Sequence, residues 1–164
     1  MDPDDVRAAD LDGDGDGELI RMAKFIVEDF EKEGLGALSP QLTREVIREC
    51  LEAGAKVVQK ETSNYIYSAH RASGDLSRSV KPSKVHEDVD ASWIEVYPQD
   101  YDSRGVSNEM KAHIIVNGYY NRASGRSKRK KDNFLPKVRK RVEPRILSVM
   151  EYQFDLCMKK INGG

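Results

Sequence analysis

The sequence has little cysteine and no long apolar run. Cys50 and Cys157 are the only cysteines among 164 residues, and both fall in segments with helical spacing. Two thiols without close spacing are typical of reduced, buried side chains in a cytosolic protein, not of a disulfide scaffold. Because no apolar run reaches the roughly 18 residues of a membrane-spanning helix, we expect no membrane partner. The first residues are acidic where a signal peptide is basic and then apolar, which predicts a soluble protein made in a cytoplasm.

Recognisable catalytic motifs are also missing. The three histidines, His70, His86 and His113, have no cysteine or second histidine at a metal-ligand spacing. The sequence contains no nucleophile elbow, Walker loop or dinucleotide fingerprint. The serines of 73–79 have no SxxK-type partner. We therefore predict a protein that is not an enzyme, with no cofactor and no metal.

Charge is abundant but unevenly distributed. The net charge is only −1. Residues 1–18 carry eight acidic side chains and a single arginine, whereas residues 122–145 carry eleven basic side chains and two acidic ones. Such a chain can attract copies of itself head to tail, or bind two different partners.

An acidic, glycine-rich stretch, DLDGDGDGEL at 10–19, resembles part of an EF-hand calcium loop. Starting at Asp10, the pattern supplies carboxylates at loop positions 1, 3 and 5 and a glycine at position 6. Position 12 of the loop should be a bidentate glutamate, but it is Arg21, and a start at Asp12 places Ala23 there. Neither register completes the site.

We interpret residues 1–17 as a flexible acidic arm rather than a metal site. Glu18 then falls in the first turn of a predicted helix, where a negative charge suits the helix dipole. Weak, millimolar calcium binding is the alternative interpretation of the arm. Four alternating carboxylates in the arm are candidates for contact with a neighbouring subunit: Asp10, Asp12, Asp14 and Asp16.

Helical spacing recurs at both ends of the remaining chain. Apolar residues predict a helix over 18–33 and a second over 40–62, the latter with Ser39 as N-cap and Pro40 as first helical residue. Gly54 in the second helix would allow close approach of another element. Near the C-terminus we expect a short helical turn at 135–142 and a long helix from 144, because Pro144 suits the first position of a helix.

The middle of the chain is rich in β-branched and aromatic residues. Three segments predict strands: SVKPSKV (79–85), SWIEVYP (92–98) and KAHIIVNG (111–118), with a loop over 99–110. Together with the helices, they predict an α+β fold, in which long N-terminal and C-terminal helices pack on an antiparallel sheet of three to four strands. Residues 18–164 would form this single domain.

A polar basic loop is predicted at 121–133. Its tract GRSKRKK could bind nucleic-acid phosphates, although it lacks interleaved aromatic residues for stacking on bases. We expect an electrostatic contact without sequence specificity, either to DNA or to the acidic arm of a neighbouring copy. The candidate contact residues are Arg126, Lys128, Arg129, Lys130 and Lys131.

The order of several short motifs resembles a known family. SGDL at 73–76 followed by SV at 79–80 is similar to a TGxLxxSI stretch, IVNG at 115–118 to a VExGT stretch, and NFLP at 133–136 to PFLRPA. A helix containing AKVV precedes the first motif. In this order the motifs resemble the tail-component, or neck, family of lambdoid long-tailed bacteriophages.

The resemblance covers roughly residues 17–161. The chain departs from the family pattern at Asn117, which stands in place of a glutamate, in its shortened FLP, and in the basic insertion at 121–133. On the residues themselves, Gly74 suits a turn that leads into the sheet, and Phe134 and Leu135 are anchors for a helix that begins near Pro136.

The resemblance implies a structural virion protein at the head–tail junction, a head–tail connector or tail-completion subunit. By this resemblance, we expect the subunits to form a homo-oligomeric ring of sixfold or twelvefold symmetry. The ring would join the connector to the tail. The partners would be other phage neck, connector and tail proteins, with non-specific contact to packaged DNA, and the location would be the virion. A non-catalytic nucleic-acid-binding protein using residues 122–145 is the alternative, and a calcium-responsive module is a third.

Overall fold

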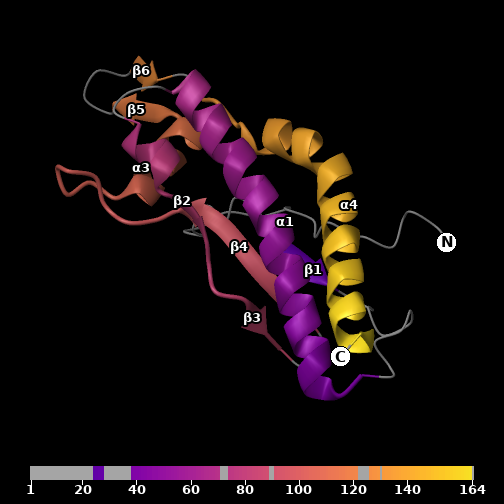
Figure 1. Ribbon diagram of the computed structural model, residues 1–164. Coiled ribbons are helices and arrows are strands. Elements are labelled where there is room, and N and C mark those ends of the chain that lie inside the picture. The colour runs from indigo at the N-terminus through magenta and orange to yellow at the C-terminus, as the bar shows by residue number, and fades with distance from the viewer. Residues whose placement is uncertain are drawn as a thin grey trace.

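A computed structural model describes residues 24–27, 38–70, 74–88, 91–121, 126–129 and 131–163 (Figure 1). Its described part combines helices with an antiparallel sheet, so the predicted α+β class is confirmed. The acidic arm at 1–17, including Asp10, Asp12, Asp14 and Asp16, lies outside the described residues.

The longest helix, α1, spans Pro40–Ala69. The Oγ of Ser39 accepts a hydrogen bond from the backbone N–H of Leu42 at 3.4 Å, and Pro40 occupies the first turn. Both features confirm the predicted helix start. The helix continues beyond the predicted end at residue 62, because Thr62 and Ile66 still face the core.

Helix α4 spans Leu135–Asn162 and includes Pro144 in its interior. The prediction of two separate helices was therefore wrong. A proline leaves one carbonyl on the preceding turn without its helical donor. Here Pro144 and Lys140 are both exposed, so water can satisfy that carbonyl. Figure 1 shows that the first turns of α4 run at an angle to the rest, as expected for a proline kink.

Helices α1 and α4 lie side by side in antiparallel directions (Figure 1). They approach closely at Gly54, where an added Cβ would lie 3.2 Å from Sδ of Met150 and 3.6 Å from Cγ2 of Ile146. This confirms that Gly54 permits close approach. Cys50 and Cys157 are buried free thiols at the same interface, which confirms the expectation for both cysteines.

Strand β4, Ser92–Pro98, is the centre of the sheet and matches the predicted segment. It pairs antiparallel with β1, Lys24–Val27, and with β2, Val80–Pro82. Strand β3, His86–Glu87, pairs with the same residues of β4 as β1 does, so it must lie on the opposite side, in line with β2. The sheet is thus three strands wide. Helix α1 covers the face that carries Ile94 and Val96.

Two predicted elements were wrong. Lys24–Val27, inside the helix predicted over 18–33, is strand β1; its KFIV sequence has high β-propensity, and pairing with β4 outweighs the helical spacing. The strand predicted at 111–118 is helix α3, Asn108–Asn117. Ser107 caps it by accepting from the N–H of Met110, and three buried residues share its inner face at helical spacing: Ala112, Ile115 and Val116.

The predicted basic loop at 121–133 is also partly structured. Strands β5, Tyr119–Asn121, and β6, Arg126–Arg129, pair antiparallel as a hairpin. The backbone of three candidate contact residues, Arg126, Lys128 and Arg129, therefore belongs to a strand rather than to a loop. The polar composition concealed this pairing, since charged residues have low β-propensity.

Short element α2, Asp75–Arg78, leads into β2. Gly74 precedes it with φ of +77°, a conformation that other residues adopt only at a steric cost. Leu76 and Val80 are buried, and the Oγ of Ser79 donates to the Leu76 carbonyl at 2.8 Å. The positive φ of Gly74 confirms the predicted turn into the sheet, and the buried Leu76 and Val80 anchor the stretch that follows it.

Candidate interaction surfaces

Among the predicted basic contact residues that the structure describes, Arg126, Lys128 and Arg129 belong to strand β6 and Lys131 follows it. The β5–β6 hairpin comes between α3 and α4 in the chain, and Figure 1 draws it toward the end of the molecule at which α1 ends. Lys131, which follows the hairpin, is exposed. Lys130 lies outside the described residues.

Asp132 connects this end to the core. Its Oδ2 lies 2.8 Å from Nε2 of His70, the C-cap of α1, and its Oδ1 accepts from Nζ of Lys137 on α4 at 2.7 Å. The hydroxyl of Tyr65 also donates to it, and its own N–H donates to the carbonyl of Ile115 on α3 at 2.9 Å. One residue thereby ties three helices at the exit of the hairpin.

The same junction is charged and aromatic. Burial by itself raises the pKa of Asp132, but hydrogen bonds from Lys137, His70 and Tyr65 outweigh it and hold the pKa below its usual range. Phe134 is fully buried and stacks on the ring of Tyr65, with centroids 5.5 Å apart. The Lys137 ammonium lies 5.6 Å from the centroid of the Tyr65 ring. Asp132 therefore stays ionised at neutral pH, and its hydrogen bonds hold the backbone that follows the hairpin against the helices.

A cationic stretch continues from this junction along the first half of α4. Among the described residues, ion pairs join Lys137 to Asp132 and Arg141 to Glu61, but none involves the other three cations of the stretch. Those exposed charges are free to meet an anionic partner. The stretch consists of Lys137, Arg139, Lys140, Arg141 and Arg145.

A second surface is the loop 99–107 between β4 and α3, which projects from the body at the left of Figure 1. We call this loop, with the first turn of α3, the knob. Its two ends are joined by a β-bridge between Tyr101 and Ser107. The loop turns back through hydrogen bonds from the Asp102 N–H to the Val106 carbonyl and from the Gly105 N–H to the Asp102 carbonyl, both 2.9 Å long. Gly105 has φ of +76°, which suits glycine at this turn.

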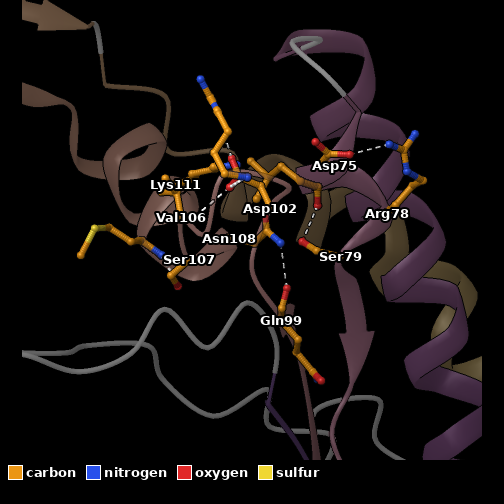
Figure 2. A network of polar contacts seen from close by, with 12 residues as sticks. Asp75, Arg78, Ser79, Gln99, Asp102, Val106, Ser107, Asn108 and Lys111 are labelled. Carbon is orange, nitrogen blue, oxygen red and sulfur yellow. Dashed lines mark hydrogen bonds and ion pairs between the residues drawn. The ribbon is translucent and has the colours of Figure 1, made fainter.

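Asp102 holds the knob in shape (Figure 2). Its carboxylate accepts from the backbone N–H groups of Arg104 and Val106, each at 2.8 Å, and from Nζ of Lys111 on α3 at 2.5 Å. The Asp102 side chain is only 2% exposed. Lys111 above all, and then the N–H of Val106, hold its pKa well below the usual range. An ionised carboxylate with three donors makes this loop rigid at neutral pH.

Neighbouring polar bonds attach the knob to the sheet. Figure 2 shows Nδ2 of the buried Asn108 donating to the Gln99 carbonyl, at 3.0 Å. Asp100 has a φ of +63°, unusual for a residue with a side chain. Its carboxylate pairs with Lys81 on β2 at 2.5 Å. Anchored in this way, the knob should keep its orientation relative to the sheet.

The anchored knob presents large side chains to solvent. Tyr101 is 73% exposed, Met110 60% and Val106 40%. Arg104 is 81% exposed, and its ion pair within the described residues joins Nε to Asp102 at 3.5 Å. Exposed aromatic, methionine and arginine side chains on a rigid support are typical of protein–protein contact surfaces.

A shallow groove lies at the other end of α1, over its first turns and the tip of β3. It combines acidic and basic side chains with the apolar stems of two arginines one helical turn apart. Its lining residues are Pro40, Gln41, Arg44, Glu45, Arg48 and Glu87.

The sequence predicted a contact role for the basic residues of 126–131 and gave no prediction for the groove, the knob or Asp132. The knob has a local signal, because Asp102, Ser103, Arg104 and Gly105 form a tight turn whose first carboxylate accepts from backbone groups two and four residues on. The partners of Asp132 on α1 lie 62 and 67 residues away in the sequence, so no local pattern indicates them.

The described ranges contain no cluster of three or more histidine, cysteine, aspartate or glutamate side chains arranged to hold a metal ion. Within the same part of the chain, none of the helices combines the length and apolar character needed to cross a lipid bilayer. Comparison with models of known protein families, with curated proteins and with solved structures finds no match to this chain.

Proposed function

We propose that the protein is a structural virion subunit of a tailed bacteriophage, forming a homo-oligomeric ring at the head–tail junction and joining the connector to the tail. One observation carries the proposal beyond the sequence resemblance. Two of the family-like motifs occupy junctions at the same end of α1. The serine-rich SGDLSRSV stretch contacts α1 through Ser63, whose hydroxyl donates to the Ser77 carbonyl. The NFLP stretch contacts α1 through Phe134, which stacks on Tyr65.

The order of the motifs supports the family resemblance more strongly if the motifs also have related structural roles. Here the SGDLSRSV stretch connects the end of α1 to the sheet, and the NFLP stretch precedes the last helix, α4. Both stretches therefore pack against α1 at a connection between elements. Two of the departures from the family pattern lie at or after the end of α3: Asn117 is exposed, and the basic insertion includes strand β6. That distribution favours a shared scaffold with a partner surface specific to this chain.

Charge supports an assembly role. A ring needs heterologous contacts, in which two different patches of the same subunit meet and the rotation closes. The subunit offers an acidic stretch at 1–18 and a basic end at the hairpin and α4. Opposite charges on separate parts of one chain favour head-to-tail association over mutual repulsion.

The test is electron microscopy of a lysate from a phage that lacks this gene. DNA-filled heads beside separate, finished tails are expected, because the joint would be missing. Filled heads beside tails of abnormal length would instead indicate tail termination. Intact virions would exclude a role in the head–tail joint.

A charge-reversal variant sharpens this test. Changing Lys128, Arg129, Lys130 and Lys131 to glutamate should block head–tail joining. The matched control makes the same charge change at four exposed lysines away from the hairpin: Lys56, Lys60, Lys84 and Lys159. Normal phage yield from the hairpin variant would count against a contact by this basic end.

The cationic stretch of α4 favours a second candidate, a non-catalytic nucleic-acid-binding protein. Exposed cations on one helix beside a basic hairpin match the electrostatic footprint of phosphate binding. The isolated protein would then bind duplex DNA with an affinity that falls steeply as salt rises, and Lys140→Glu with Arg145→Glu would flatten that dependence. Binding that is absent at low salt would exclude this function.

A further inference from the structure

We propose that the knob of one subunit docks into the α1 groove of a second copy of this chain. This inference rests on the proposed ring and names its contact. The knob presents Tyr101, Val106, Met110 and Arg104. The groove is lined by residues of the first turns of α1 and by Glu87 of β3.

The first argument is rigidity. Exposed apolar side chains on a loose loop would lose much conformational freedom on binding, which weakens association. Asp102 reduces this loss of conformational freedom, because the loop is already ordered before binding. Its buried carboxylate accepts hydrogen bonds from the backbone N–H groups of Arg104 and Val106 and from Nζ of Lys111. Burying a charged carboxylate costs desolvation free energy. We therefore expect the loop shape that Asp102 maintains to serve a function.

The second argument is position. The knob is attached to the sheet beside α2, which contacts α1 near Ser63. The groove begins at Pro40 on the same helix. At 1.5 Å per residue, these points are roughly 35 Å apart along α1. Figure 1 shows the projecting loop and the start of α1 at separate ends of the molecule. A knob and a groove so placed cannot meet within one subunit, and between copies they produce a heterologous contact.

The third argument is chemical fit. Arg44 and Arg48 lie one turn apart and offer flat guanidinium groups and apolar stems. Such groups stack on aromatic rings and pack against thioethers, which suits Tyr101 and Met110. The exposed Arg104 would meet the acidic side of the groove.

That acidic side consists of Glu45 and Glu87. Glu45 makes one long hydrogen bond, 3.4 Å from Gln41, and both glutamates are exposed. The arginines of the groove would in turn face Asp100 at the base of the knob, where that carboxylate is 62% exposed. Each surface therefore offers both signs of charge, and charge complementarity of this kind fixes orientation more than it adds affinity.

The experiment uses the full chain and two single-cysteine additions. One copy carries Tyr101→Cys and the other Glu45→Cys, and a short bismaleimide links them after mixing. Cross-links between the two different copies are expected, and mass spectrometry identifies them. Tyr152→Cys is the control partner, because this side chain is 65% exposed and belongs to neither the knob nor the groove lining. Equal cross-linking of the control and Glu45→Cys would overturn the proposal.

A charge exchange tests the pairing itself. Arg104→Glu should weaken association at least tenfold in sedimentation experiments. Adding Glu45→Arg and Glu87→Arg to the same chain should restore it. Association of Arg104→Glu equal to that of the parent, no rescue by the exchange, or a monomeric parent at all concentrations would each overturn the docking. Circular dichroism of each variant checks that the fold is retained.

The two proposals can fail separately. If rings assemble equally well with all these substitutions, the docking is refuted and the virion role is unaffected. Knob-to-groove association in a protein whose deletion leaves intact virions would support the docking and refute that role.

Discussion

Gly54 on α1 faces Met150 on α4 so closely that a methyl group on the glycine would touch the methionine sulfur, at 3.2 Å. The Cys50 thiol lies beside the same contact and donates to the Met150 carbonyl at 3.7 Å. The helices therefore meet where α1 has least side-chain volume. Closely packed interiors tolerate added volume poorly, so this contact sets the spacing of the two longest elements.

Gly54→Val should destabilise the protein by about 1–3 kcal/mol, because branched methyl groups would collide with Met150 and Ile146. Gly54→Ala is the matched control. Its gain in helix propensity of about 1 kcal/mol opposes a milder contact with a flexible methionine, so little net change is expected. Urea unfolding measures both. A valine variant as stable as the parent would mean that the helices are free to separate.

Phe134→Ala should cost about 3–5 kcal/mol of unfolding free energy, the usual range for a fully buried phenylalanine. The ring anchors the start of α4 and stacks on Tyr65, so its removal loosens the junction as well as the core. Phe134→Leu is the control and should cost clearly less, because it leaves a smaller cavity. Equal losses for the two variants would show that the ring stack, and not cavity volume, dominates.

Local rules predicted the parts of this fold that depend on neighbouring residues. Ser39 and Pro40 mark a helix start, Gly54 marks a close approach, and the β-branched and aromatic residues of 92–98 indicate a strand. Each of these depends on side chains within a few positions of one another. The same holds for Phe134 as a core anchor.

The missed elements depend on distant partners. Strand β1 exists because Lys24–Val27 pairs with β4, about seventy residues later in the chain. Helix α3 contains the β-prone run HIIV, but its Ser107 cap and its buried inner face decide the conformation. The groove and the Asp132 junction were missed for the same reason, since the groove combines α1 with Glu87, and Asp132 combines three helices.

Asp132→Asn should lower stability by about 1–2 kcal/mol at neutral pH, a modest loss for charged hydrogen bonds because the carboxylate is partly exposed. The folded pKa of Asp132 lies below its unfolded value of 3.8. Its ionised form therefore stabilises the protein above about pH 4, and that contribution disappears as pH falls through the folded pKa. The difference in unfolding free energy between parent and variant, measured by urea titration, should become smaller below pH 4. A difference that is constant with pH would refute this role.

Asp102→Asn should speed hydrogen exchange at the backbone N–H groups of Arg104 and Val106, which donate to the carboxylate. The folded pKa of Asp102 also lies below the unfolded value of 3.8, so the protection is fully present above about pH 4 and weakens at lower pH. Parent and variant are compared at each pH. The Asn108 N–H, which donates to Asp100, is the internal control and should change less. Unchanged exchange at Val106 would mean that other bonds hold the knob.

The thiol of Cys50 should be almost unreactive in the folded protein. Burial, and then the charges of Cys157 and Glu49, raise its pKa from 9.0 to about 12, so at pH 8 it holds roughly a thousandfold less thiolate than an ordinary cysteine. Burial also raises the pKa of Cys157, whose thiol donates to Glu49 at 3.2 Å. Iodoacetamide should therefore label both residues rapidly in urea and neither on the same timescale in buffer, as peptide mass spectrometry can show. Rapid labelling of Cys50 in buffer would mean that α1 and α4 separate readily, and the spacing argued for Gly54 would then be wrong.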